Sequence, residues 1–134
     1  MKDYFCPVCR SQLRIDDQIA LSAKSSKNEQ GLIFLSAKIG DYSKKTHPDF
    51  EIREGEEYKF YCSVCHAQLN DEEKPNMVKI KLEEDGTIYD CYFSNIAGEE
   101  VTFKVRGEEV EEYGFHKERR RKYFDVPDEY KKYL

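Results

Sequence analysis

The chain has no long hydrophobic run. No stretch approaches the roughly 18 apolar residues that a membrane-spanning helix requires. The first residues, Met1 to Cys6, also lack the apolar run of a secretory signal peptide. We therefore expect a soluble protein of the cytoplasm that makes no contact with membranes.

The sequence also lacks the motifs of common enzyme classes. It contains no Gly-rich phosphate loop, no Gly-x-Ser-x-Gly elbow and no His-Glu-x-x-His pattern. The three histidines, His47, His66 and His116, are scattered along the chain. These absences indicate a non-enzymatic protein, so we assign no catalytic residues.

Tryptophan is absent and no flexible low-complexity linker interrupts the chain, whose 134 residues suit a single domain, 1–134. Apolar residues make up only 39%, but ten tyrosines and eight phenylalanines add material for a modest core. Charged residues make up 37%, well above the roughly 25% of an average globular chain. The net charge of −5 argues against a protein whose whole surface wraps DNA.

Four of the five cysteines form two Cys-x-x-Cys pairs, Cys6 with Cys9 and Cys62 with Cys65. Both pairs follow two aromatic residues, and both continue Cys-x-Val-Cys-x-x-Gln-Leu. The second copy, at 60–69, lies 56 residues after the first, at 4–13. This ten-residue match is the internal repeat that we recognise in the sequence.

Two facing Cys-x-x-Cys turns supply four thiolates at tetrahedral angles, the arrangement that Zn²⁺ prefers. Cytosolic thiols are kept reduced, so paired cysteines there indicate metal ligands or redox centres before disulfides. Four sulfurs fill the coordination sphere, so the predicted site is structural and holds one Zn²⁺ per chain. We expect Leu13 and Leu69 to pack beneath it.

On these residues the chain resembles the zinc-ribbon, or rubredoxin-like, group of metal-binding folds. The resemblance implies two knuckles, here residues 4–13 and 60–69, on hairpin tips that clamp one metal beside a small antiparallel sheet. Two features depart from the group. Arg10 and His66 stand where ribbon knuckles often have glycine, and the spacer between Cys9 and Cys62 has 52 residues, far more than the usual roughly 15–20. The sheet must therefore contain an insertion, or each pair meets a pair from a partner chain.

Other interpretations of the cysteines remain open. Iron uses the same four ligands and would make a redox protein. A thioredoxin-like dithiol needs a strand before the motif, and Cys6 leaves little room for one. The string from Cys62 to His66 also matches a c-type haem attachment site, whose chemistry belongs outside the cytoplasm. His66 could replace a cysteine as ligand, although we expect it to lie exposed beside the site.

The remainder of the chain favours β-structure, so we expect a mainly β fold built on an antiparallel sheet. Strands are expected at 18–24, 32–39 and 58–62, with a long loop over 40–57. A three-stranded meander is expected over 77–106, with a turn at Asp85-Gly86. Its apolar residues alternate with charged ones, and we expect Lys79, Lys81, Glu83 and Lys104 to form a solvated charged face. The unpaired Cys91 is expected to be a small buried hydrophobe.

The last segment, 113–134, mixes basic and aromatic residues. We expect short C-terminal helices at 115–124 and from Val126 onward. Cations beside aromatic rings suit single-stranded nucleic acid. The candidate residues are Arg119, Arg120, Arg121, Lys122, Tyr123 and Phe124. Neighbouring glutamates, Glu108, Glu109, Glu111 and Glu112, favour the simpler interpretation of a solvated surface.

These observations favour a non-enzymatic module in which zinc supports binding to another protein. The contact would involve the charged sheet, the 40–57 loop or the rim of the knuckles. Single-stranded nucleic-acid binding through the basic-aromatic segment is the alternative, and iron-based electron transfer is the third.

Overall fold

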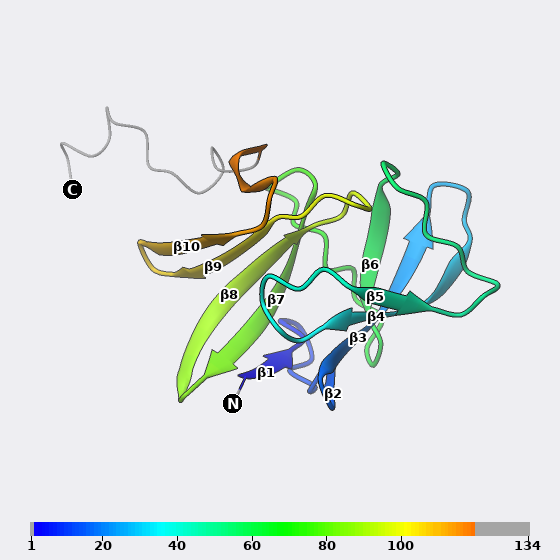
Figure 1. Ribbon diagram of the computed structural model, residues 1–134. Coiled ribbons are helices and arrows are strands. Elements are labelled where there is room, and N and C mark those ends of the chain that lie inside the picture. The colour runs from blue at the N-terminus through cyan, green and yellow to red at the C-terminus, as the bar shows by residue number, and fades with distance from the viewer. Residues whose placement is uncertain (1, 120–134) are drawn as a thin grey trace.

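Two antiparallel sheets make up the structure, a computed structural model that describes residues 2–119 (Figure 1). The β7 sheet has the strand order β1 (Lys2–Phe5), β7 (Met77–Glu84), β8 (Thr87–Ser94), β9 (Thr102–Arg106) and β10 (Glu109–Tyr113). The β3 sheet has the order β2 (Arg14–Ile15), β3 (Gln18–Ser25), β4 (Gln30–Ser36) and β5 (Lys44–Thr46), and β6 (Tyr58–Cys62) also pairs with β3. The expected mainly β, antiparallel architecture is confirmed.

The strongest sequence patterns produced the expected strands. The strands β3, β6, β7, β8 and β9 overlap the ranges in which the sequence predicted them. Asp85 and Gly86 both have positive φ, 51° and 83°, which a tight hairpin turn of this kind requires. The β7–β8–β9 meander is therefore confirmed, and β1 and β10 extend it at its two edges.

Two expectations about local structure were wrong, and a third is covered only in part by the described residues. The strand β1 lies directly before Cys6, where we expected no room for one. The expected 40–57 loop contains β5, a three-residue edge strand, and β10 forms from a stretch rich in glutamate. Of the expected C-terminal helices, the described residues show only a 3-10 helix, Lys117–Arg119, and the remainder lies outside them. No helix in residues 2–119 is long and apolar enough to cross a membrane.

The main core lies between the two sheets. It includes Leu21 and Ile33 from the β3 sheet and Ile80, Leu82 and Cys91 from the β7 sheet. Cys91 is 4% exposed, as expected for a small buried hydrophobe. A second cluster packs Met77, Tyr92, Val101 and Phe103 together. Because Tyr92 pairs with Phe103 and Cys91 with Lys104, this second cluster lies on the opposite face of the sheet from Cys91.

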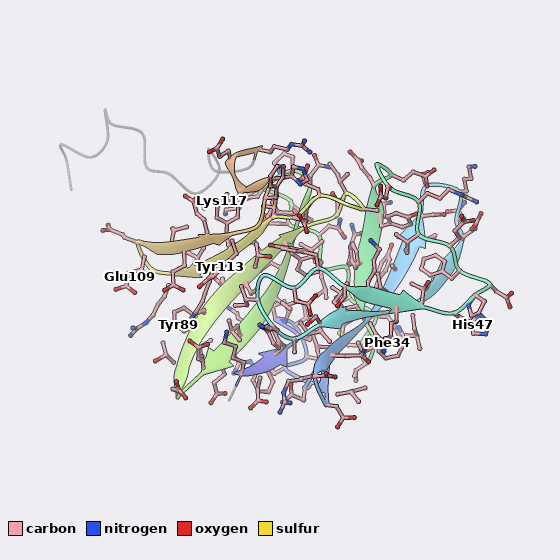
Figure 2. All side chains as sticks on the ribbon, viewed as in Figure 1. Phe34, His47, Tyr89, Glu109, Tyr113 and Lys117 are labelled. Carbon is pink, nitrogen blue, oxygen red and sulfur yellow. The ribbon has the colours of Figure 1, made fainter. Side chains whose placement is uncertain are left out.

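The expected solvated position of Lys104 was therefore wrong. Its side chain lies on the inner face, is only 6% exposed and bonds to Glu84 at 2.8 Å. Glu111 lies 3.4 Å away, and the ammonium sits 4.2 Å from the centre of the Tyr89 ring. Figure 2 shows Tyr89 and Tyr113 on the side of the molecule formed by β8, β9 and β10. Alternation alone did not reveal the correct face, because both faces of β9 are buried.

The strands of the chain repeat the same order and the same register. We call β1–β5 the first half and β6–β9 the second half. In the first half Ile19 pairs with Leu35 and Ile33 pairs with Thr46. The equivalent pairs in the second half are Val78 with Phe93 and Cys91 with Lys104. The repeat seen in the sequence over ten residues therefore extends through the whole chain up to β9.

The two halves exchange their first strands. The strand β1 pairs with β7 of the second half, with Tyr4 opposite Leu82. The strand β6 pairs with β3 of the first half, with Phe60 opposite Ala23. The 52-residue spacer is therefore mostly the β3 sheet itself, and each sheet contains strands from both halves.

Candidate metal centre

The two knuckles lie close together because the segments that flank them pair with the same two strands, β3 and β7. Since β4 occupies one edge of β3, β2 and β6 lie end to end along its other edge, with Arg14 opposite Ile19 and Cys62 opposite Leu21. On the other sheet, β1 and Asn70 lie in the same way along the free edge of β7. Each knuckle therefore lies next to the equivalent knuckle of the other half of the chain.

The backbone hydrogen bonds of the two knuckles match one for one. The amide of Arg10 donates to the Cys6 carbonyl at 2.9 Å, and the amide of His66 donates to the Cys62 carbonyl at 3.0 Å. Three further backbone bonds have equivalents with nearly the same lengths. The amides of Cys6 and Cys62 donate to the carbonyls of Ser11 and Ala67, respectively. The amides of Leu13 and Leu69 donate to Tyr4 and Phe60, and those of Ala20 and Lys79 donate to Leu13 and Leu69. Leu13 and Leu69 are buried beneath the site as expected, at 1% and 4% exposed.

Both knuckles require a left-handed residue after the second cysteine. Arg10 has φ 63° and His66 has φ 64°. Glycine adopts this conformation at little cost, whereas other residues pay about 1–2 kcal/mol. The two residues that stand in place of the expected glycines therefore adopt the conformation that glycine favours, at some cost in strain.

The sulfur atoms of Cys6, Cys9, Cys62 and Cys65 all lie within 4.8 Å of one another. Two of the sulfur–sulfur contacts join different knuckles, Cys6 to Cys65 at 3.8 Å and Cys9 to Cys62 at 3.7 Å. Sulfurs that surround one ion tetrahedrally at about 2.3 Å lie about 3.8 Å apart. The cluster is thus compatible with a metal site to which each knuckle contributes two ligands.

Backbone amides point at the inner sulfur of each knuckle. The amides of Val8 and Cys9 lie 3.3 and 3.4 Å from the sulfur of Cys6. Val64 and Cys65 repeat both distances at Cys62. Hydrogen bonds to sulfur favour its charged form, so the knuckle backbone is arranged to support thiolates.

The inner and outer cysteines differ in exposure. Cys6 and Cys62 are fully buried, whereas Cys9 and Cys65 face solvent. Burial raises the pKa of the Cys6 thiol to about 12. Hydrogen bonds from Ser11 lower the pKa of Cys9 to about 6. A coordinated cation deprotonates a thiol outright, so a bound metal would offset the cost of a buried thiolate at Cys6.

Other candidate residues do not join the cluster. His66 is exposed beside the site, as expected. His47 contacts Asp49 at 3.5 Å, and Figure 2 shows it beyond β5, on the opposite side of the molecule from Lys117. Among residues 2–119, the cysteine quartet is the group of metal-binding side chains that the structure brings together.

The predicted nucleic-acid residues fall almost entirely outside the described part. Arg119 lies within it and forms an ion pair with Glu99 at 3.4 Å. Arg120, Arg121, Lys122, Tyr123 and Phe124 lie outside the described residues.

Sequence reasoning missed Ser11, the residue that tunes Cys9, and it missed most of the duplication. A signal for the duplication was present. Ile19, Leu21 and Ala23 alternate after the first knuckle as Val78, Ile80 and Leu82 do after the second. The three extra residues before the second series obscure the match.

No protein-family model, curated protein or solved structure matches the chain. The functional argument therefore rests on the geometry of the site.

Proposed function

We propose that the four cysteines bind one Zn²⁺ per chain and that the metal stabilises a non-enzymatic interaction module. One observation carries this proposal. Within residues 2–119 the chain passes from one sheet to the other twice, from β1 to β2 and from β6 to β7. Each passage contains one Cys-x-x-Cys pair. A metal held by both pairs ties the two passages together.

The donor set supports a structural role. Four thiolates complete a tetrahedral zinc sphere and leave no position for a substrate or an activated water. Zinc binding contributes on the order of 10 kcal/mol in small structural sites. The whole stability of a domain is about 5–15 kcal/mol. Loss of the metal is therefore expected to abolish stable packing of the two sheets.

Metal analysis of native-purified protein tests the proposal. We expect one zinc per chain, no visible colour, and a large fall in melting temperature on chelation. A red or brown protein that contains iron would instead support the redox alternative. Protein without metal, whose four thiols all titrate freely, would reject the zinc site.

The rim of the knuckles is the proposed contact surface for a protein partner. Val8 and Val64 occupy equivalent positions and are 65% and 56% exposed. Arg10 and His66 lie beside them and are also exposed. Arg14 instead forms an ion pair with Asp3 at 3.0 Å and belongs to the strand framework.

Paired charge substitutions test this surface. We expect Val8→Asp with Val64→Asp to abolish partner binding while zinc content stays at one per chain. Ile88→Asp is the matched control, because Ile88 is 62% exposed on β8. Binding that survives the double substitution would move the contact to another surface, and binding lost on nuclease treatment would favour nucleic acid.

A further inference from the structure

A cavity of about 290 Å³ lies between the two sheets. Its inner wall is built from equivalent positions of the two halves, Ile33 with Cys91, Leu35 with Phe93, and Tyr4 with Phe60. The metal cluster is likewise built from equivalent cysteines. The relation between the halves therefore creates two composite sites, and the proposed function uses only the first.

The size and lining of the cavity suit a small organic molecule. Ligand pockets begin at about 300 Å³ and are mostly apolar with a few polar groups. An apolar cavity of about 150 Å³ accommodates benzene, so this one has room for roughly two fused rings. Aliphatic side chains and the rings of Phe60 and Phe93 provide the apolar wall. The two rings pack edge to face with centres 5.4 Å apart.

Hydrogen bonds hold the mouth of the cavity in place. The hydroxyls of Tyr42 and Thr102 lie 2.9 Å apart, so they link the 37–43 loop to β9. The Tyr4 hydroxyl donates to the Ala37 carbonyl at 2.6 Å. Close to the Tyr42–Thr102 bond, the Glu100 amide donates to Nδ1 of His116 at 3.1 Å. These contacts hold the loops that line the cavity, so the cavity exists before any ligand arrives.

The charges at the mouth select the class of ligand. Four acidic residues are among those that line the cavity, from three loop segments: Asp41, Glu54, and the neighbouring Glu99 and Glu100. Lys38 and Lys44 supply the ammonium groups of the lining, and Arg119 pairs with Glu99. Negative charge therefore predominates around an apolar interior, which suits an apolar body that carries a positive charge.

We propose that this cavity binds a small aromatic amine. The ring system would lie against Phe60, Phe93 and Leu35, and the ammonium group would face Glu54 and Glu100 at the mouth. This assignment goes beyond the structural zinc site and does not depend on the identity of the protein partner.

Calorimetric titration of the zinc-loaded full chain with tryptamine tests the proposal, with indole-3-acetate as the matched anion. We expect saturable binding of one tryptamine per chain, about tenfold or more tighter than indole-3-acetate, because the carboxylates attract the ammonium group and repel the carboxylate of the anion. No saturation up to millimolar tryptamine, or equal affinity for the two probes, would overturn it.

Two variants locate the binding. Glu54→Gln combined with Glu100→Gln should remove most of the preference for the amine. The control Glu51→Gln, on an exposed residue outside the cavity lining, should leave it unchanged. Leu35→Phe should fill the cavity and weaken both probes, with zinc content confirming that the variant is folded. Unchanged binding in both cavity variants would show that the amine binds elsewhere.

Discussion

The two halves of the chain share one backbone arrangement, but different side chains fill the equivalent positions near the ends of their hairpins. The position of Gly31 in the first half is that of Tyr89 in the second, and Thr46 corresponds to Lys104. In the first half Phe50 packs directly on Gly31 and meets the Tyr58 ring edge to face at 6.4 Å. In the second half the Lys104 ammonium lies over the Tyr89 ring and bonds to Glu84.

This comparison separates what the fold requires from what it tolerates. Both halves keep the two cysteines, the left-handed knuckle residue and inward apolar residues in the same register. The end of each hairpin instead holds either a packed aromatic ring, Phe50 on Gly31, or a buried ion pair, Lys104 with Glu84. The cysteine cluster is therefore the place where the halves must agree, and the hairpin ends are where they can diverge.

The largest predicted effect tests whether the two halves contribute equally to the proposed zinc site. Cys6→Ser and Cys62→Ser each remove one fully buried cysteine of the proposed zinc site. We expect both to lose stoichiometric zinc and most of the cooperative thermal transition, and by similar amounts, because each half contributes equally. Elemental analysis and calorimetry measure this. Cys91→Ser, outside the cluster, should keep its zinc, and a full zinc complement in only one of the two inner variants would break the symmetry.

Loss of the buried ion pair of Lys104 in the second half should give the next largest fall in stability. Lys104→Met leaves Glu84 and Glu111 without their buried cation. Because both carboxylates keep some contact with water, we expect a loss of about 1–3 kcal/mol in unfolding free energy, below that of a fully buried pair. Thr46→Val, at the equivalent position of the first half, should change little. Urea unfolding of both variants checks the difference.

A change at the contact between Gly31 and Phe50 in the first half is expected to lower stability by a similar amount. A Cβ atom on Gly31 would lie 2.7–2.9 Å from the Phe50 side chain. Gly31→Ala should therefore cost about 1–3 kcal/mol through overpacking. Adding Phe50→Leu should recover part of this loss in a double-mutant cycle. Independent, additive effects would show that the two residues do not meet.

The ion pair of the second half should also make stability depend on pH. The hydrogen bond from Lys104 lowers the pKa of Glu84 below its ordinary value. A carboxyl whose pKa is lower in the folded state stabilises above the unfolded pKa of about 4.3, and this stabilisation disappears as pH falls through the folded value. The stability difference between wild type and Glu84→Gln should therefore be largest at pH 7 and shrink below about pH 4. A difference that is constant with pH would exclude this linkage.

The smallest effect concerns the strained knuckle residues. Arg10→Gly and His66→Gly should each raise stability by up to about 1 kcal/mol, because glycine adopts the left-handed conformation without strain. Arg10→Ala retains the strain and should give no gain. Matched gains would show that the two knuckles are energetically as well as geometrically equivalent. A loss in either glycine variant would mean that the side chain contributes more than its strain costs.

The sequence predicted those parts of the molecule in which side-chain chemistry determines structure locally. The cysteine spacing predicted all four clustered residues, and the alternation of apolar with charged residues predicted the strands β7 and β9. It failed where both faces of a strand are buried, so the inward position of Lys104 was missed. It also failed at β5 and β10, short edge strands whose lysines and glutamates resemble loop residues.

Residue identity reveals the duplication at the knuckles, and beyond them only the alternation of apolar residues continues it. Backbone register tolerates replacement of one apolar residue by another, such as Ile33 by Cys91, as long as the inward pattern is kept. The exchange of β1 and β6 between the halves, and the cavity that results, depend on long-range pairing that no local pattern specifies.

X-ray absorption at the zinc edge of native-purified protein tests the central claim most directly. The account predicts one zinc per chain with four sulfur neighbours at about 2.3 Å and no nitrogen ligand. A mixed sphere with imidazole nitrogen would assign His66 to the metal. That result would contradict the claim that the two halves contribute equivalent pairs of cysteines.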